Sequence, residues 1–232
     1  MATPPVSSTV RYRFVSTTAD GRLRRTRWYD VGPAEWVAAT DSRAGKLSVV
    51  GGAVEAADVT WLVGPEGTRR VRFSLPLRPE DRVVGLGERF DAVDQRGLCP
   101  DAVVFEQYKS QGEHGRTYLP MPFALVVGPA DSWGFHVRTA RRTWYDVGAT
   151  TPDRLVIEVA TGGDDHVELA TYSGSPAKIL DAFLEEAGRP SELPDWVFRL
   201  WASGNEWNSQ ARVMQEMDRH RELDIPVGAL VI

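Results

Sequence analysis

The sequence predicts a mostly β chain: an antiparallel β-sandwich over residues 1–173, a linker helix and connector over residues 174–194, and a βαβ unit over residues 195–232. Three observations lead to this fold class. Short runs of β-branched and aromatic residues, separated by Gly, Pro and Asp, fill residues 9–171. Helical spacing of apolar residues begins after residue 173, and the last six residues are an apolar run of the kind found in buried parallel strands.

The predicted sandwich strands are recognised by composition and by alternation. Apolar and other residues alternate clearly in residues 71–75 and 167–170, as expected where one face of a strand is buried. Examples of these runs are residues 10–15, 47–50, 59–63, 70–75, 102–105, 123–127, 133–137, 155–159 and 166–172. Their length and the turn residues between them favour an antiparallel sandwich.

A helix of about three turns is predicted to follow the sandwich. Ser175 suits the N-cap and Pro176 the first helical position, while Gly188 stands where a C-cap glycine belongs. The apolar residues at helical spacing are Ile179, Leu180, Phe183 and Leu184. Residues 190–194, with a proline at each end, form a stiff connector to the next segment.

The last segment predicts a strand at residues 194–201, a helix at 209–223 and a strand at 227–232. On the helix we expect Val213, Met214, Met217 and Leu223 to point inward, and Arg212, Glu216, Arg219 and Glu222 to face water. Parallel strands need neighbours and helices on both faces. We therefore expect residues 195–232 to open a larger α/β domain.

Composition excludes several classes of function. A net charge of −5 gives no reason to expect nucleic acid or an anionic membrane as partner. The arginine-rich residues 22–27 alternate with other residues, which favours the solvated face of a strand over a binding patch. Residue 1 is not followed by a signal-peptide pattern, and no run approaches 18 apolar residues, so we expect a cytoplasmic, soluble protein.

Cofactor and metal motifs are weak. The G-x-G of residues 85–87 lacks the third glycine of a dinucleotide site, and a strand end that turns on glycines explains it better. Cys99 and the four histidines lack metal-ligand spacing, so no cofactor and no metal are expected. The histidines are His114, His136, His166 and His220.

Two segments carry side chains suited to sugars. Residues 105–118 are too long for a tight hairpin and rich in amide, carboxylate, aromatic and cationic groups, although a solvated loop is the plainer alternative. Asn205, Glu206 and Trp207 follow the first parallel strand, where α/β proteins bind ligands. Trp207 is equally suited to be a sugar platform or a core residue beneath this loop.

Taken together, four stretches resemble the family 31 glycoside hydrolases, the α-glucosidase and α-xylosidase group. The resemblance covers residues 80–232 well and the first 80 residues weakly. The stretches are Gly85-Leu86-Gly87-Glu88-Arg89-Phe90-Asp91 with Gln95-Arg96-Gly97; Tyr118-Leu119-Pro120-Met121-Pro122-Phe123; Trp133-Gly134-Phe135; and Trp201-Ala202-Ser203 with Asn208-Ser209-Gln210 and Asp224-Ile225-Pro226. The resemblance implies a galactose-mutarotase-like sandwich, then the first βαβ unit of an incomplete (β/α)8 TIM barrel.

The same resemblance implies retaining hydrolysis of α-glycosidic bonds by two aspartates, a nucleophile and a general acid/base. The family carries both on later barrel strands, and a sugar-binding carboxylate just beyond the position of Ile232, so none is expected here. The implied substrate-binding residues are Glu106, Gln107 and Tyr108 on a sandwich loop that overhangs the barrel, and Asn205 and Trp207 after the first barrel strand. Where Asn205 aligns, the family often has an aromatic residue.

Two hypotheses follow. In the first, the chain is the N-terminal portion of an α-glycosidase that binds an oligosaccharide or glycoside, lacks the catalytic aspartates and is inactive without the remainder of the barrel. In the second, it is a stand-alone carbohydrate-binding or interaction module built on the sandwich. An apolar parallel strand at residues 227–232 favours the first, because a finished module has no use for such an edge.

Overall fold

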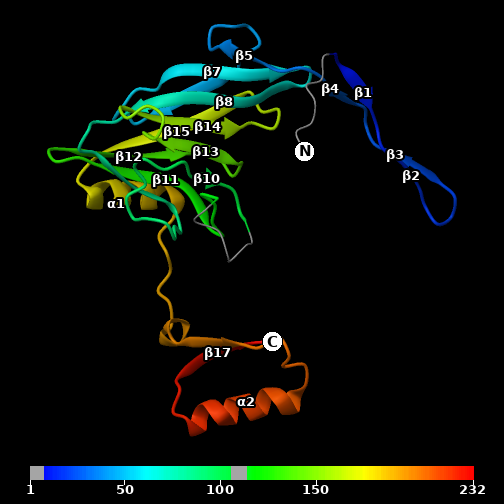
Figure 1. Cartoon of the computed structure of the whole chain (residues 1–232), viewed down its shortest axis with the longest axis vertical. Helices are drawn as coiled ribbons and strands as arrows, with labels where there is room; N and C mark the ends of the chain where they lie inside the picture. The colour runs from blue at the N-terminus through cyan, green and yellow to red at the C-terminus, as the bar shows by residue number, and fades with distance from the viewer. Residues whose placement is uncertain (1–7, 106–113) are drawn as a thin grey trace. The chain divides into compact units, whose positions relative to one another are not determined.

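The structure is a computed structural model that describes residues 8–105 and 114–232. The chain divides into two compact units, Met1–Glu186 and Ala187–Ile232. Each unit is described by itself below, with the element labels of Figure 1. The first unit holds the strands of a sandwich and one helix, and the second holds a single βαβ unit.

One layer of the sandwich is an antiparallel six-stranded sheet in the order β10-β13-β14-β8-β7-β5. Its strands are β5 (Glu35–Ala38), β7 (Ala57–Gly64), β8 (Gly67–Pro76), β10 (Asp101–Ala102), β13 (Thr143–Val147) and β14 (Arg154–Ala160). Alternating burial along β14 shows why this segment is a strand: Leu155, Ile157 and Val159 are fully buried while the residues between them are not.

The other layer is a five-stranded sheet in the order β6-β15-β12-β11-β9. Its strands are β6 (Lys46–Val50), β9 (Arg82–Gly87), β11 (Pro120–Val127), β12 (Ser132–Val137) and β15 (His166–Gly174). Three of its pairings are antiparallel, but β6 runs parallel to β15, with Lys46 opposite His166. The expectation of a wholly antiparallel sandwich is therefore wrong for β6. Two strands so far apart in sequence are not joined by a hairpin, which leaves either direction open to them.

A single apolar core lies between the two sheets. Trp61 and Phe73 from the six-stranded sheet, and Phe135 and Leu169 from the five-stranded sheet, belong to one cluster of buried side chains. The rings of Phe135 and Tyr145 approach across the layers with centroids 6.2 Å apart. Each large apolar side chain that is fully buried contributes about 1.5–3 kcal/mol, so this core is the main source of stability in the first unit.

Helix α1 (Pro176–Ala187) covers the outer face of the five-stranded sheet. Ile179 and Phe183 are its buried residues, and Phe183 stacks on Phe123 of β11 with ring centroids 4.0 Å apart. Gly134 of β12 leaves room for Ile179 of the helix, because a Cβ at Gly134 would lie 2.5 Å from the Ile179 side chain. The helix predicted from the sequence is therefore found, and it is packed into the first compact unit.

Residues 10–31 form two short antiparallel ribbons ahead of the sandwich (Figure 1). Strand β1 (Val10–Tyr12) pairs with β4 (Tyr29–Val31), and β2 (Val15–Thr17) pairs with β3 (Leu23–Arg25). The strand expected at residues 10–15 is thus interrupted at Arg13 and Phe14. The arginine-rich segment forms the strand β3, and every residue of that strand is exposed.

The second unit contains a 3-10 turn, η1 (Asp195–Phe198), then β16 (Leu200–Ser203), α2 (Gln210–Glu222) and β17 (Val227–Val231). Strands β16 and β17 are parallel, as expected for a βαβ unit. The strand predicted at residues 194–201 is wrong over its first half. Short-range hydrogen bonds close a turn there, from Val197 N to Pro194 O (3.0 Å) and from Arg199 N to Trp196 O (3.2 Å).

Helix α2 is found where a helix was predicted, and its N-cap is Ser209, whose hydroxyl accepts a hydrogen bond from the Arg212 amide. Its inward face differs from the prediction: Met214 and Leu223 are 45% and 53% exposed. The partly buried stripe instead follows Val213, Glu216, Met217 and His220, because two strands can cover only a narrow part of the helix. Neither α1 nor α2 in the described residues is long and apolar enough to span a bilayer.

Candidate functional site

The three residues predicted on the sandwich loop, Glu106, Gln107 and Tyr108, lie outside the described residues. Both flanks of their segment are described. Phe105 and His114 meet edge to face with ring centroids 5.9 Å apart, and the Arg116 guanidinium lies 4.9 Å from the centre of the Phe105 ring. The Phe105 amide donates to the Thr117 carbonyl oxygen at 3.1 Å. The two flanks of the predicted loop are therefore fixed against each other.

Asp101 is the electrostatic centre of these flanks. Its carboxylate is almost fully buried and accepts from Arg142 Nε (2.8 Å) and Nη2 (2.6 Å) and from Arg116 Nε (2.7 Å). Burial by itself would raise the pKa of Asp101, but the hydrogen bonds and charges of Arg142 and Arg116 outweigh it, and the net shift is downward. Asp101 also donates its amide to the Gly115 carbonyl oxygen (2.8 Å). A charge held in this way fixes the end of β10 to the far flank of the loop.

The last three residues of β9 give a second support. Gly85, Leu86 and Gly87 all have positive φ angles, and the 66° of Leu86 is unusual because that residue is not a glycine and is buried. A Cβ on Gly87 would lie 2.0 Å from the Leu119 carbonyl oxygen, so the close approach to β11 requires a glycine. This strand end directs the following residues, starting with Arg89, toward the loop.

The Arg89 side chain is buried and holds the far flank of the predicted loop. Its Nη1 donates to the Gly115 carbonyl oxygen at 2.8 Å, and its Nη2 pairs with the Asp91 carboxylate. Burial would raise the pKa of Asp91, but bonds from Arg89, the Ala92 amide and the Gln95 side chain lower it overall. Within the sequence motif at residues 85–91, Arg89 therefore anchors Gly115 through its buried side chain.

In the described part of this region, several buried polar side-chain atoms near Arg89 and Thr117 have no hydrogen-bond partner. Among the described residues, five side-chain atoms are buried without a hydrogen bond, and Arg89 Nε, Gln95 Oε1 and Thr117 Oγ1 are three of them. Leaving such an atom unpaired costs about 1–3 kcal/mol. Native structures tolerate few of them, and each calls for an explanation such as a functional role. The base of the loop is thus a polar, strained and partly unsatisfied region.

The second predicted surface lies in the other compact unit, where Asn205 and Trp207 follow β16. Asn205 is exposed in a turn, and Trp207 is half-buried with its amide bonded to the Gly204 carbonyl oxygen (3.1 Å). The indole packs on the Gly204 backbone, since a Cβ at that position would lie 2.3 Å from the ring. Strands β16 and β17 are parallel, with Ser203 opposite Val231, so these residues lie at the carboxyl edge of the pair.

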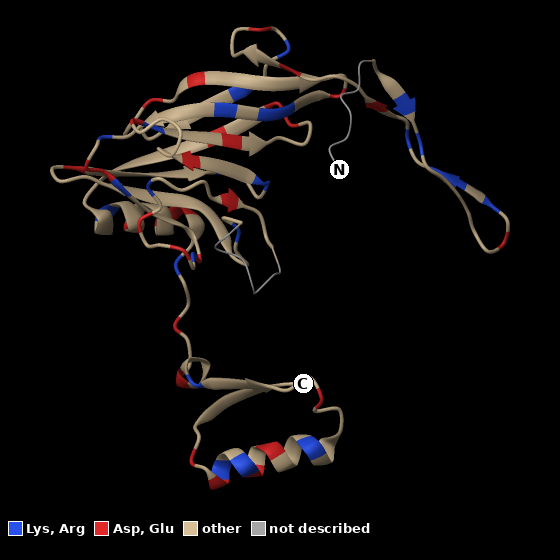
Figure 2. Ribbon diagram, in the orientation of Figure 1, with Lys and Arg blue, Asp and Glu red and all other residues tan. Residues whose placement is uncertain are grey.

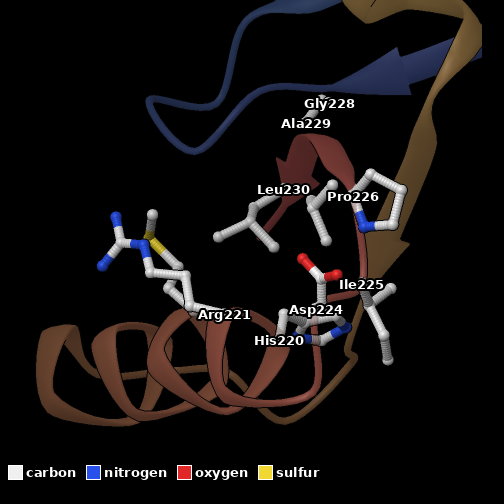
Figure 3. Close-up of a pocket in the computed structure, with 10 residues that line it drawn as sticks. His220, Arg221, Asp224, Ile225, Pro226, Gly228, Ala229 and Leu230 are labelled. Atoms are coloured by element: carbon white, nitrogen blue, oxygen red, sulfur yellow. The ribbon is translucent and has the colours of Figure 1, made fainter.

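A cavity of about 540 Å³ in the second unit lies between α2 and β17 (Figure 3). His220 and Arg221 line it from the helix, and Leu230 lines it from the strand. Neither Asn205 nor Trp207 lines it, so it is separate from the predicted sugar-contacting residues. In the part of the chain that the structure covers, no group of three or more His, Cys, Asp and Glu side chains could hold a metal ion.

Comparison with known proteins places these features in a family. The family described as the glycosyl hydrolase 31 N-terminal galactose mutarotase-like domain matches residues 10–146. A 1,3-alpha-isomaltosidase of Kribbella flavida is 55% identical over 231 residues, 99% of this chain and 31% of that protein. An isomaltosyltransferase of Sporosarcina globispora is 30% identical over 179 residues, 75% of this chain and 16% of that protein.

Among solved structures, the cycloalternan-degrading enzyme of Trueperella pyogenes is 50% identical with a TM-score of 0.77. The match covers 97% of this chain and 31% of that one, and the enzyme has been solved with cycloalternan and with a covalent intermediate. The chain thus spans about a third of the length of the Kribbella flavida and Trueperella pyogenes relatives. The family match covers more than half of the residues, and this chain belongs to glycosyl hydrolase family 31.

Proposed function

We propose that this chain is the N-terminal portion of a retaining α-glycosidase that hydrolyses O-glycosyl bonds in α-glucose oligosaccharides. The supporting observation is the similarity of nearly the whole chain, at 55% identity, to a 1,3-alpha-isomaltosidase. The structures of the Trueperella pyogenes enzyme with cycloalternan and with isomaltose favour oligosaccharides that contain isomaltose units as the substrate class. In this proposal the chain supplies groups that bind the sugar, and the catalytic aspartates lie outside residues 1–232.

The chemistry of a retaining glycosidase supports placing the catalytic aspartates outside residues 1–232. A retaining glycosidase needs a carboxylate nucleophile and, roughly 5–5.5 Å away, a carboxylic acid with a raised pKa that protonates the leaving oxygen. In the described part of the chain, every carboxyl group with a resolved pKa shift is shifted downward instead. These groups are Asp20, Asp41, Asp91, Asp94, Asp101, Asp131 and Glu186. They are suited to hold arginines and amides, not to donate protons at neutral pH.

The binding role is proposed for two sets of side chains. Glu106, Gln107 and Tyr108 belong to the segment whose flanks are fixed by Arg89 and Asp101. Anchored flanks limit the conformations of the segment between them, which lowers the entropy lost when it orders around a ligand. Asn205 and Trp207 follow β16 at the carboxyl edge of the parallel pair, the position that α/β folds use for ligands.

A stand-alone carbohydrate-binding or interaction module is the second candidate. One observation favours it: residues Met1–Glu186 form a compact unit with a core of their own. A module of this kind would bind an oligosaccharide without any need for further chain. Binding and turnover by the isolated chain therefore distinguish the two candidates.

The test uses highly purified 232-residue chain with aryl α-glucoside, isomaltose and cycloalternan. The proposal expects no release of aglycone or glucose, and binding of the sugars too weak to saturate at millimolar concentration, because the binding groups belong to an unfinished pocket. Saturable binding at micromolar concentration without turnover would support the module. Turnover that is abolished by amidating one carboxylate of this chain would contradict both.

A further inference from the structure

The two ribbons at residues 9–31, here called the arm, expose an unusual number of apolar side chains. All nine residues of β1, β2 and β3 are exposed. The exposed apolar side chains are Val10 (52%), Tyr12 (37%), Phe14 (64%), Val15 (52%), Leu23 (57%) and Trp28 (48%). Isolated two-stranded ribbons are at best marginally stable in water. The arm therefore needs a surface against which these side chains can be buried.

The aromatic side chains of the arm are arranged before any partner arrives. Tyr12 stacks on Tyr29 with centroids 5.4 Å apart and meets the edge of Phe14 at 5.7 Å. The guanidinium of Arg13 lies 4.6 Å from the centre of the Trp28 ring. Rigid aromatic side chains with arginine beside them are the commonest anchors of protein interfaces, since little side-chain entropy is lost when they bind.

Charge identifies what the arm can contact. Residues 9–31 hold six arginines and two aspartates, a net charge of +4, whereas the whole chain carries −5. The rest of the chain therefore carries a net charge of −9. Residues 32–186, which form the sandwich and most of α1, have 16 basic and 23 acidic side chains and a net charge of −7, and residues 187–232 have a net charge of −2. Figure 2 shows the arginines of the arm in blue. Two arms repel each other, whereas an arm and a sandwich attract.

We propose that the arm docks on the acidic sandwich of a second copy of this chain, so that two copies exchange arms. Such an exchange is closed and symmetric, because each copy contributes one arm and one receiving surface. The arm is also large enough, since a standard interface uses roughly 20–30 residues from each partner. Apolar burial supplies affinity, and the opposite charges select the sandwich over another arm.

The test is sedimentation equilibrium of the full chain over a range of concentrations, at low and high salt. The expected result is a dimer whose Kd rises as salt rises, because the charge attraction is screened. The double variant Phe14→Ser/Trp28→Ser should raise Kd at least about tenfold. The double variant Arg24→Glu/Arg25→Glu should also raise Kd at least about tenfold, and the increase should be larger at low salt than at high salt.

The matched control removes two exposed aromatic side chains of the second unit. The variant Trp196→Ser/Phe198→Ser changes side chains that are 45% and 76% exposed, and it should leave Kd within about twofold. Hydrogen exchange adds a second measurement: amides of β2 and β3 should gain protection as the dimer forms. A chain that stays monomeric, a dimer unaffected by the arm variants, or an arm protected within a monomer would each overturn the proposal.

Discussion

The substitution Glu186→Gln tests how α1 is tied to the sandwich. The Glu186 carboxylate accepts from Arg138 Nε (2.8 Å) and Nη2 (2.6 Å), from the Tyr172 hydroxyl (2.8 Å), and contacts His136 Nδ1 (2.9 Å). Arg138 also pairs with Glu168 on β15. Removing the charge of Glu186 therefore weakens a network that joins the last turn of α1 to β12 and β15.

The pKa of Glu186 gives the size of the effect. The hydrogen bonds from Arg138, assisted by those from Tyr172 and His136, lower this pKa from 4.5 to about 2 although burial opposes the shift. The lowering of this pKa from 4.5 to about 2 corresponds to about 3.4 kcal/mol. The side chain is 25% exposed, so solvent screens part of the interaction. We expect Glu186→Gln to lower the free energy of unfolding by about 1–3 kcal/mol at pH 7.

The sign of the pH dependence follows from the lowered pKa. The stabilisation by Glu186 is fully present above its unfolded pKa of 4.5 and is lost as pH falls through about 2. The gap in stability between the native sequence and Glu186→Gln should therefore narrow on acidification. At pH 3 it should be less than about half of its value at pH 7.

The assay is urea unfolding at pH 7 and pH 3, followed by near-ultraviolet circular dichroism. The control is Glu55→Gln, at an exposed position outside the network; it should change the free energy of unfolding by less than about 0.5 kcal/mol. The reasoning fails if Glu186→Gln and the control are equally stable at pH 7. It also fails if the gap at pH 3 equals the gap at pH 7.

Further substitutions test the packing and the loop. Ile179→Ala, at a fully buried position of α1, should lower the free energy of unfolding by about 2–5 kcal/mol, whereas Leu180→Ala, 44% exposed, should cost under about 1 kcal/mol; urea titration distinguishes them. Gly87→Ala forces a Cβ to within 2.0 Å of the Leu119 carbonyl oxygen and should cost about 1–3 kcal/mol, seen as a lowered Tm. The loop can be tested in a hybrid enzyme, in which this chain replaces the matching N-terminal third of the Kribbella flavida isomaltosidase. Alanine at a sugar-contacting loop residue of the hybrid should lower kcat/KM roughly tenfold to a hundredfold and change the ranking of substrates. The residues to replace are Glu106, Gln107 and Tyr108. Changes within about twofold for all three would remove the loop from the binding surface.

Much of the fold could be predicted from local patterns. Alternation in residues 71–75 predicts β8, and cap residues with helical spacing predict α1, because these signals depend on neighbours in sequence. Strand β13 is not among the predicted strands, and only the glycine-rich end of β9 is predicted. Two glycines with positive φ interrupt the pattern of β9, and β13 pairs on one side with Asp101 and Ala102 of β10, which are distant in sequence. The 3-10 turn at residues 195–198 competes with a strand for the same aromatic, β-branched sequence.

Less of the candidate site than of the fold could be predicted from the sequence. The motif at residues 85–91 can be identified from the sequence, but the contact of Arg89 with Gly115 joins residues 26 positions apart. Asp101 gave no signal at all, because its partners Arg116 and Arg142 lie 15 and 41 residues further along the chain. Such polar networks follow from tertiary structure, and single-sequence patterns do not encode them.

The central claim is that this chain supplies the sugar-contacting N-terminal part of an α-glycosidase without its catalytic carboxylates. The most direct measurement is kcat/KM of the hybrid enzyme on oligosaccharides with isomaltose units, beside the unaltered Kribbella flavida enzyme. The account predicts activity within about a hundredfold of that enzyme, since the exchanged third affects binding but not bond cleavage. It also predicts that no single carboxylate of residues 1–232 is indispensable in the hybrid. An inactive hybrid that is folded, or loss of all turnover on amidating one of these carboxylates, would contradict it.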